Sequence, residues 1–589
     1  MRRSLFSLWT TVVFGIVLCA LPLPTRAQDV IFVNGKIVTL NDRSDVVQAL
    51  AVANGRITAV GSNDEIRRLA GPRTRVVDLG GKTTIPGFYD NHVHGGGALQ
   101  EWNGGMIGAV PEWLRDVDTM DELLAALRQR AAGMPPGEWL RGSLPREIWP
   151  NQKVPTRWDL DRVAADRPIA LSRGPHTLLL NSQALQLAGI TRDTPNPPGG
   201  WIIRDASGEP TGRVLEAARR LVTSAMPPER AGRNTAGEGG GLQRTRSFLL
   251  QLAGLGITSV NIAGVGAAGL GELQELYQRF GEELPRATVQ VRLSPGFDSY
   301  DNPEEGVRQE LAKLEALGFR TGFGSDRLKL GAVKMSIDGG LSAPVFWSTK
   351  PYKGRPDFYG AQRIPDEAFY RVARRAHELG WQLGIHTMGD AAVVMVVDQL
   401  ERILGEMPRS DHRHYLHHVA VKPPEATLQK MSRLGIMVAS QPGFTVGLGA
   451  YAEEALDPER EATQNPTRSL LDHGIAVSYG SDAGPYGPLL GIHAAVTRRG
   501  WDGKVRGPEE AVSVEQALRL HTVGSAHFTF DEKTRGTLEV GKVADLAVLS
   551  DDILTMAPER IKEIRVERTI LGGREIYARR AATSQEQAR

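Results

Sequence analysis

The stretch PGFYDNHVH, residues 86–94, decides the fold more than any other part of the chain. On a β-strand, residues two apart point to the same side, so His92 and His94 project together into one space. Two neutral imidazoles side by side supply half of a metal site. Taken alone, the pair is equally consistent with two ordinary polar contacts, so the strands that follow must decide between the two interpretations.

Those strands alternate with helices over several hundred residues, and the predicted helices include 366–379 and 424–434. Such alternation predicts an α/β fold, a (β/α)8 TIM barrel, with an open parallel sheet as the alternative. The predicted strands begin near Thr84, Ile257, Val289, Leu330, Gln382, His414, Ile436 and Ala476.

Three of the later predicted strands end in residues that bind metals. His386 ends the fifth, His418 ends the sixth, and Asp482 follows the last. Active sites of these barrels lie at the C-terminal ends of the strands. A single histidine there is more often structural, but the order His-x-His, His, His, Asp over four strand ends indicates one metal centre. Cys19 is the only cysteine and lies in the N-terminal leader, so the ligands must be nitrogen and oxygen.

The two ends of the chain, residues 28–85 and 533–580, consist of short β-rich runs. Neither block is large enough to bury a core alone, so we expect them to pair into one small β-sandwich. The barrel then covers 86–532 with an insertion at about 97–244, which contains a predicted strand, 169–172, and a hairpin around 205–208. The tail 581–589 is polar and predicted to be disordered.

The N-terminal leader, residues 1–27, has the features of a cleaved export signal. Arg2 and Arg3 precede an apolar run from Leu8 to Leu23, and small residues precede the cleavage point after Ala27. A membrane anchor is the alternative, but the run is shorter than the ~20 residues that a bilayer requires. We therefore expect a periplasmic or extracellular protein without a stable membrane anchor after cleavage.

Composition narrows the class of protein further. Apolar residues make up 41% and charged residues 23% of the 589 residues, as in a soluble globular protein. The net charge of +2 gives no reason to expect nucleic acid or an anionic membrane as partner. A small-molecule substrate is expected, and the oligomeric state stays open, although a homodimer is the commonest assembly.

With these motifs the sequence resembles the amidohydrolase superfamily, in particular the broad-specificity branch that includes the N-substituted formamide deformylases. The resemblance covers nearly the whole chain after the leader. It is carried by residues 86–94, by HTMGD at 386–390, by GSD at 480–482, by GKVADL at 541–546, and in the insertion by PHTLLLNS at 175–182 and PTGRVLE at 210–216.

The resemblance implies a divalent metal, zinc in the first place, with one or two ions and no organic cofactor. It also implies that Lys334 is a further ligand, carboxylated by CO2 so that the resulting anion bridges two ions. An uncarboxylated Lys334 beside a single ion is the alternative, and Glu216 is a second candidate carboxylate donor. The metal ligands implied are His92, His94, Lys334, His386, His418 and Asp482.

Two positions depart from the pattern of the relatives. His417 stands where they often have glutamate, and Asn261 replaces a usual His-Asp pairing. Because neighbouring side chains of a strand alternate, we expect His417 to point away from the barrel interior if His418 points in. The change at Asn261 bears on substrate preference.

The expected reaction is hydrolysis of a non-peptide carbon–nitrogen bond by metal-activated water. Asp482 would take the proton of the water and pass it to the leaving nitrogen. His176 either hydrogen-bonds the substrate or is structural. The alternatives are hydrolysis of an ester or dipeptide-like substrate, glycoside cleavage by paired carboxylates, and a non-catalytic secreted binding protein on the same barrel.

Overall fold

A computed structural model provides the structure of the chain. It describes residues 28–95, 98–102, 104–109, 112–114, 117, 119–135, 137–144, 154–174, 176–227, 240–297, 299–342 and 345–580. The predicted leader 1–27 and tail 581–589 lie outside the described residues. Within these ranges, no helix combines the length and the hydrophobicity that a membrane crossing requires.

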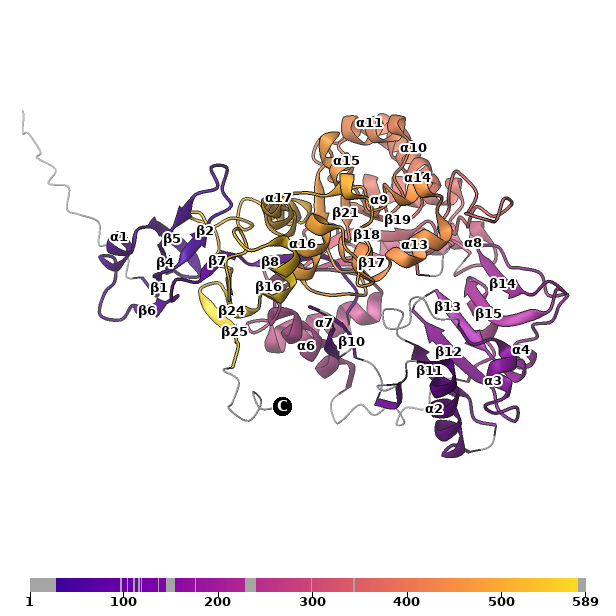
Figure 1. Ribbon diagram of the computed structural model, residues 1–589. Coiled ribbons are helices and arrows are strands. Elements are labelled where there is room, and N and C mark those ends of the chain that lie inside the picture. The colour runs from indigo at the N-terminus through magenta and orange to yellow at the C-terminus, as the bar shows by residue number, and fades with distance from the viewer. Residues whose placement is uncertain are drawn as a thin grey trace, which may run out of the picture.

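An eight-stranded parallel sheet forms the centre of the molecule (Figure 1). Its strand order is β22-β21-β20-β19-β18-β17-β16-β8. A parallel bridge between Val93 and Asp482 links the segment after β22 to β8, so the barrel is nearly closed. The predicted barrel of parallel strands is thereby confirmed. Its strands are β8 (Phe88–Val93), β16 (Ile257–Val265), β17 (Arg286–Arg292), β18 (Leu328–Ser336), β19 (Leu383–Thr387), β20 (Tyr415–His418), β21 (Met437–Ser440) and β22 (Val477–Tyr479).

The first barrel strand begins later than predicted. Thr84 lies in β7 (Thr83–Pro86), which belongs to a different sheet, and the barrel strand starts at Phe88. The chain changes sheets at Gly87, where a Cβ atom would lie 2.3 Å from the side chain of Thr258. One stretch of sequence without an obvious break, residues 83–93, therefore contains two strands of different sheets.

The longer helices cover the outside of the barrel with one apolar face. In α9 the buried residues Phe369, Val372, Ala373 and Ala376 recur at helical spacing. The predicted helices 366–379 and 424–434 agree with α9 and α11 within one residue. The α-helices of the barrel region are α6 (Gly240–Ala253), α7 (Ala267–Phe280), α8 (Pro303–Ala316), α9 (Asp366–Glu378), α10 (Asp390–Glu406), α11 (Glu425–Leu434), α12 (Gly443–Gly447), α13 (Gly449–Ala455), α14 (Pro458–Glu461), α15 (Thr467–Asp472), α16 (Pro488–Thr497), α17 (Val514–Arg519) and α18 (Ser525–Phe528).

Strands from both chain ends meet in one six-stranded sheet with the order β25-β24-β23-β7-β2-β3. A four-stranded sheet, β5-β4-β1-β6, shares a hydrophobic core with it, in which Phe32 and Leu50 join Leu546 and Ile570. That these sheets form a separate sandwich domain stays a prediction. The strands are β1 (Val30–Val33), β2 (Lys36–Val38), β3 (Val46–Val47), β4 (Ala49–Ala53), β5 (Arg56–Gly61), β6 (Arg75–Asp78), β23 (Leu546–Leu549), β24 (Val566–Leu571) and β25 (Arg574–Ala578).

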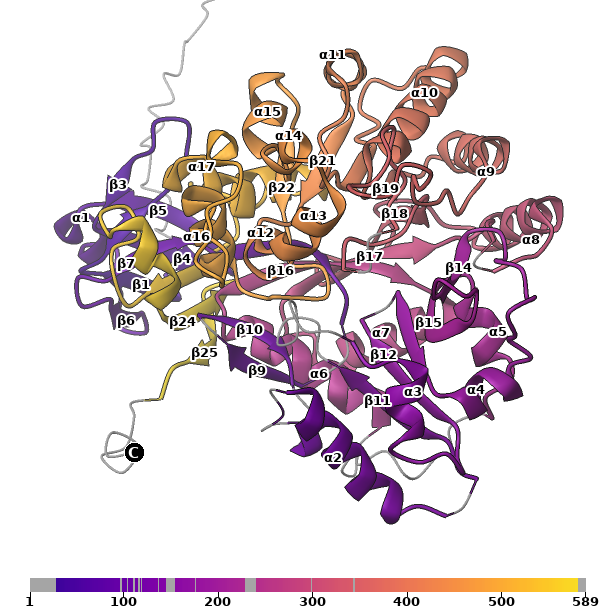
Figure 2. The same cartoon turned by 45° about the vertical axis from the view of Figure 1, so that its right-hand side comes forward.

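The insertion carries a sheet of its own, β11-β12-β13-β15-β14, beside the barrel (Figure 2). The predicted strand 169–172 corresponds to β12, and the predicted hairpin joins β14 to β15. The strands are β11 (Leu140–Leu144), β12 (Ile169–Arg173), β13 (Thr177–Leu180), β14 (Gly200–Arg204) and β15 (Pro210–Glu216), flanked by α2 (Met120–Ala132), α3 (Arg157–Asp161), α4 (Ser182–Leu187) and α5 (Arg219–Thr223).

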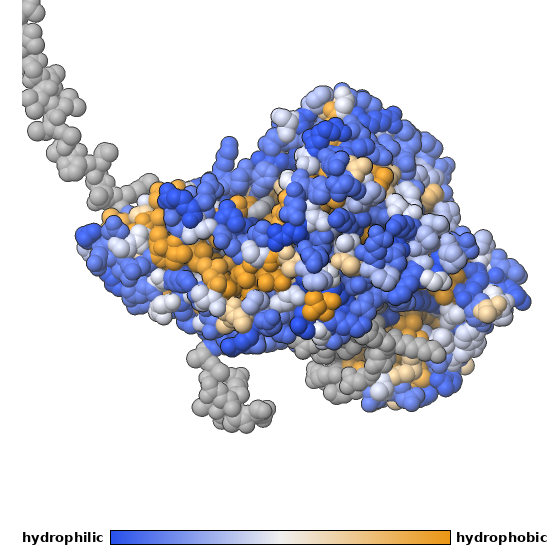
Figure 3. All heavy atoms as spheres, turned by 45° about the horizontal axis from the view of Figure 1, so that its top comes forward, coloured by the Kyte–Doolittle hydropathy of each residue, from blue (hydrophilic) through white to orange (hydrophobic). Residues whose placement is uncertain are grey.

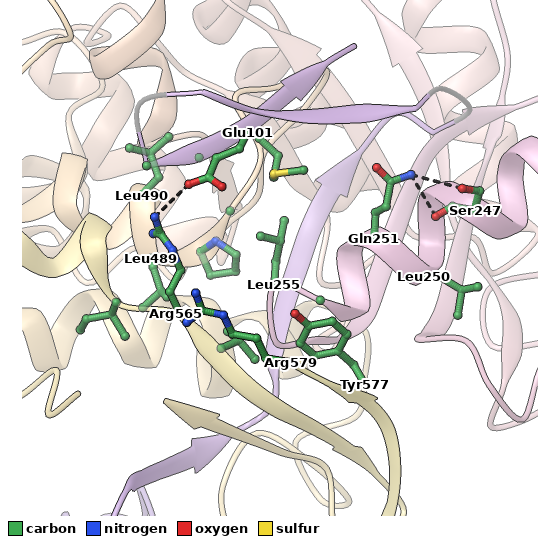
Figure 4. A pocket seen from close by; sticks show the side chains of 18 residues that line it. Glu101, Ser247, Leu250, Gln251, Leu255, Leu489, Leu490, Arg565, Tyr577 and Arg579 are labelled. Carbon is green, nitrogen blue, oxygen red and sulfur yellow. Dashed lines mark hydrogen bonds and ion pairs between the residues drawn. The ribbon is translucent and has the colours of Figure 1, made fainter. Parts of the chain in front are cut away.

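The surface in Figure 3 is mostly hydrophilic, with a band of hydrophobic side chains where the sheets of the chain ends meet the barrel. A cavity of about 480 Å³ lies on the outer side of the barrel (Figure 4). Its walls come from the hairpin β9 (Leu99–Trp102) and β10 (Gly105–Gly108), and from α6, α16 and β24. The predicted metal ligands are not among its described lining residues.

Candidate metal centre

Three predicted ligands bring their donor atoms together at the C-terminal ends of β8 and β22. The Nε2 atoms of His92 and His94 are 3.3 Å apart, and they lie 3.6 Å and 3.3 Å from Oδ1 of Asp482. One donor atom from each of these residues falls within 4.8 Å of the others. Polar donors this close, two of them imidazole nitrogens and one a carboxylate oxygen, form the donor set of a divalent metal such as zinc.

The backbone fixes this arrangement. The Asp482 amide donates to the His92 carbonyl at 2.6 Å, and the His94 amide donates to the Asp482 carbonyl at 3.0 Å. Oδ1 of the buried Asp90 accepts the amides of Ser481, at 2.9 Å, and His92, at 3.4 Å. A Cβ atom at Gly480 would lie 2.4 Å from the His92 amide nitrogen, so only glycine allows the two strand ends this approach.

His386 and His418 lie beside the first three residues. Their ring centroids are 4.4 Å apart, and the His418 ring is 4.9 Å from that of His92. Nδ1 of His418 lies 2.6 Å from Oε1 of Gln441, whose amide donates to the Ala439 carbonyl. An amide oxygen only accepts, so Nδ1 carries the proton and Nε2 keeps a free lone pair.

The proton of His386 is placed by the same reasoning. Its Nε2 faces the Gly339 carbonyl at 3.4 Å and Oδ1 of Asp338 at 3.5 Å. Both neighbours are acceptors, so Nε2 carries the proton and Nδ1 is left to donate an electron pair. Burial holds the pKa of His386 well below its usual range and lowers that of His418 to about 3, so both rings are in the neutral form that binds metals.

Lys334 lies at the same centre, on β18. Its charge lowers the pKa values of His92, His386 and His418. The Nζ atom is buried and has no hydrogen-bond partner among the described residues. Burial lowers the pKa of Lys334 to about 7, opposed by the carboxylate of Asp482. Burial without a partner is costly for an ammonium group, so these surroundings favour the neutral amine of Lys334.

His417 corrects the expectation from strand alternation, because it points into the barrel. Its ring centroid is 4.1 Å from that of His92, and its Nε2 is 2.9 Å from Oε1 of Gln290 on β17. The backbone explains the error: φ is +72° at His418 and +53° at Val419, so the strand ends there and consecutive side chains both face inward.

Asn261 belongs to the polar layer beneath the histidines. It accepts from Nε2 of Gln290 at 3.2 Å and donates to Oδ1 of Asn91, also at 3.2 Å, and to the hydroxyl of Tyr415 at 3.3 Å. Through Gln290 this network reaches His417. The changed second barrel strand, β16, therefore supports the candidate metal centre through this network, in addition to any effect on substrate preference.

The insertion places His176 and Glu216 at the edge of the centre. Nδ1 of His176 lies 2.7 Å from Oε1 of Glu216, which also accepts the Gly340 amide at 3.3 Å. Arg363 lies 3.8 Å from the other oxygen of Glu216. Glu216 is thus held by His176 and Arg363. Its carboxylate does not join the group of donor atoms formed by His92, His94 and Asp482.

Sequence reasoning missed Asp338, which orders the loop after β19. Its buried carboxylate accepts the amides of Met388, Gly389 and Trp347 at 2.8–3.0 Å. The carboxylate thereby sets the position of the segment that follows His386. The signal in the sequence was a carboxylate before two glycines, residues 338–340, immediately after the fourth barrel strand.

Comparison with known proteins agrees with this fold. The model of the amidohydrolase family matches residues 75–577. The chain belongs to the amidohydrolase family. An N-substituted formamide deformylase from Arthrobacter pascens is 32% identical over 93% of this chain and 98% of its own. A putative amidohydrolase from Bacillus subtilis (strain 168) is 28% identical over 92% and 98%.

A solved structure supports the fold of this amidohydrolase. An uncharacterized metal-dependent hydrolase from Pyrococcus horikoshii superimposes with a TM-score of 0.63, at 22% identity, over 90% of this chain and 99% of the other. Family membership makes the chain an enzyme, a hydrolase of the metal-dependent amidohydrolase superfamily that acts on carbon–nitrogen bonds other than peptide bonds.

Proposed function

We propose that this amidohydrolase cleaves the carbon–nitrogen bond of an N-acyl amine, with N-formyl amines the first class to test. The observation that carries the proposal is the meeting of His92, His94 and Asp482 within 4.8 Å at the strand ends. The relation to the formamide deformylase supports the substrate class.

The residues present suit a divalent metal. His92, His94, His386 and His418 offer nitrogen donors, Asp482 offers an oxygen, and the orphaned Nζ of Lys334 lies in the same buried space. Zinc prefers such nitrogen and oxygen ligands, and one or two ions fit this number of donors. When bound, the metal lowers the pKa of water and polarises a carbonyl oxygen.

Asp482 is the proton carrier in this proposal. Its side chain is 16% exposed, whereas that of His92 is fully buried, so water reaches the carboxylate. The carboxylate accepts a proton from the attacking water and donates it to the amide nitrogen as the carbon–nitrogen bond breaks. Protonation of the nitrogen is required because an amine anion is a poor leaving group.

Lys334 is proposed to be carboxylated. The neutral Nζ adds to CO2, forming a nitrogen–carbon bond and releasing one proton, and the product is an anion. A carbamate replaces the unpaired amine by two oxygen donors that can bridge two ions. An uncarboxylated Lys334 beside one ion is the alternative, and metal content distinguishes them.

His176 is proposed to hydrogen-bond the substrate from the insertion. Glu216 accepts from Nδ1, so that proton stays on Nδ1 and Nε2 is left as an acceptor. Glu216 positions the imidazole, because it is itself tied to the Gly340 amide. A purely structural His176 would leave substrate kinetics unchanged on substitution.

Gly340→Ala tests the position of His176. The added Cβ would lie 2.4 Å from Nε2 of His176, so the imidazole must move. We expect kcat/KM for an N-formyl amine to fall about tenfold, with a stability loss of about 1–3 kcal/mol in urea unfolding. His176→Gln should give a similar kinetic loss.

Gly405→Ala in α10 is the matched control, since nothing lies within 4 Å of its added Cβ. We expect unchanged kinetics and a small gain in stability. If Gly340→Ala and His176→Gln both leave kcat/KM unchanged, His176 has no part in substrate binding.

A substrate panel tests the reaction itself. The purified protein, supplied with zinc, is assayed with N-formyl and N-acetyl benzylamine, benzyl formate and an uncharged dipeptide amide, and amine or acid release is measured. We expect the formamide to be hydrolysed with the highest kcat/KM. Faster cleavage of the ester or the dipeptide-like compound would overturn the assignment of the bond, and binding without turnover of any compound would overturn catalysis.

A further inference from the structure

Two arginines lie on one face of the insertion sheet. Arg173 on β12 pairs with Thr177 on β13, and Arg213 on β15 pairs with Leu179 on β13. Thr177 and Leu179 are two residues apart and so point to the same side. Because directly paired residues share a face, Arg173 and Arg213 also point to that side.

The guanidinium of Arg213 has no direct partner among the residues that the structure describes. It makes no hydrogen bond or ion pair with any residue that the structure describes, and its Nε is buried without a partner. Burial lowers the pKa of this guanidinium, the charge of Arg173 lowers it further, and the carboxylate of Glu454 opposes the shift without reaching ion-pair distance. A desolvated cation beside a like charge is costly unless an anion joins it.

Arg173 connects this site to the barrel. Its Nη2 donates to the hydroxyl of Tyr451 on α13 at 2.7 Å, and its guanidinium lies 5.4 Å from the centre of that ring. Tyr451 shares a hydrophobic cluster with Phe444, which stacks on His418 with ring centroids 5.8 Å apart. Packed side chains thus lead from the metal centre to the arginines.

We propose that Arg173 and Arg213 bind an anionic group of the substrate, a carboxylate several bonds from the scissile carbon–nitrogen bond. This inference rests on the proposed function and names its substrate class. A guanidinium binds a carboxylate through two parallel hydrogen bonds. The carboxylate would supply the negative partner that Arg213 does not have within ion-pair distance.

The span of the sheet sets the length of the substrate. Arg213 precedes Glu216 by three residues on β15, which separates the two backbone positions by about 10 Å at ~3.3 Å per residue. The φ of +49° at Glu216 ends the regular alternation of faces at that residue. Glu216 holds His176 at the edge of the metal centre. The carboxylate therefore sits on an extended arm, as in an ω-amido acid, and not on the carbon next to the amide nitrogen.

The test uses ω-formamido acids, HCO–NH–(CH2)n–COO⁻, with n from one to seven, together with their methyl esters. The full chain supplied with zinc should prefer the longer acids over the matched esters by at least about tenfold in kcat/KM. Arg213→Met should bring the ratio of kcat/KM for acid over ester to near one by raising KM for the acid. The kinetics with the ester should stay within about twofold of those of the unchanged protein. Arg213→Lys should retain part of the preference because it keeps the charge.

Arg192→Met is the matched control, an exposed arginine of the same insertion that contacts Glu209 and the Ser207 carbonyl. It should leave the preference intact. The proposal is overturned if the unchanged protein shows no preference at any chain length, or if Arg213→Met lowers turnover of acid and ester equally.

Failure of the proposed reaction can be distinguished from failure of the proposed anion site. If none of the compounds is hydrolysed, the same acid and ester become inert ligands for titration calorimetry. Binding of the acid that Arg213→Met abolishes would still support the anion site, whereas equal binding of acid and ester would overturn it.

Discussion

Asp482→Asn should lower kcat/KM for an N-formyl amine by about 10³- to 10⁴-fold, the range expected for loss of a general base and acid. The carboxamide keeps the shape of the side chain but cannot accept the proton of water. Folding should be unaffected, because the contacts of residue 482 with His92 and His94 that close the barrel are made by its backbone. Steady-state kinetics and circular dichroism measure the two effects.

Asp42→Asn is the matched control, an exposed aspartate far along the chain from the centre. It should leave both kinetics and the circular dichroism spectrum unchanged. Retention of more than about a tenth of the activity by Asp482→Asn would show that another group moves the proton.

Lys334→Ala should remove the second metal ion and lower kcat/KM by at least about 100-fold, because the bridging anion is lost. Metal per chain, measured by plasma mass spectrometry, should fall from two ions to one or fewer. Mass spectrometry of the intact native protein should also lose the added mass of one CO2.

Lys329→Ala controls for the loss of a lysine from the same strand. Nζ of Lys329 bonds to Asp531 and to the Thr529 carbonyl, away from the centre. Its metal content should not change. One ion per chain in both the unchanged protein and Lys334→Ala would favour the single-ion site and remove Lys334 from the ligands.

The barrel could be predicted because its signals are local. Short stretches of consecutive residues are enough to recognise the alternation of strands and helices and the metal-binding residue types at strand ends. The first strand was misplaced because residues 83–93 look continuous in the sequence, although the chain passes between sheets at Gly87. The missing information was the contact of Gly87 with Thr258, which is far along the chain.

The direction of His417 could not be predicted from alternation. Alternation holds only while the backbone stays extended. The positive φ of His418 ends the extended backbone at that residue, so His417 and His418 do not point to opposite sides. Asp338 and Gln441 were missed for another reason. Their roles depend on loops that return to His386 and His418 in space, and no local pattern encodes that return.

The insertion shows the same limit. His176 and Glu216 are forty residues apart, and the pairing of β13 with β15 brings them together. The sequence suggested each as a separate candidate, but it did not indicate that one positions the other. The shared face of Arg173 and Arg213 likewise follows only from strand register.

Metal content per chain, measured together with formamide hydrolysis before and after chelation, tests the central claim most directly. We predict one to two equivalents of zinc or another divalent ion, loss of hydrolysis as the metal is removed, and its return when zinc is added back. A protein that holds no stoichiometric metal and hydrolyses the substrate equally well in the presence of chelator would contradict the account.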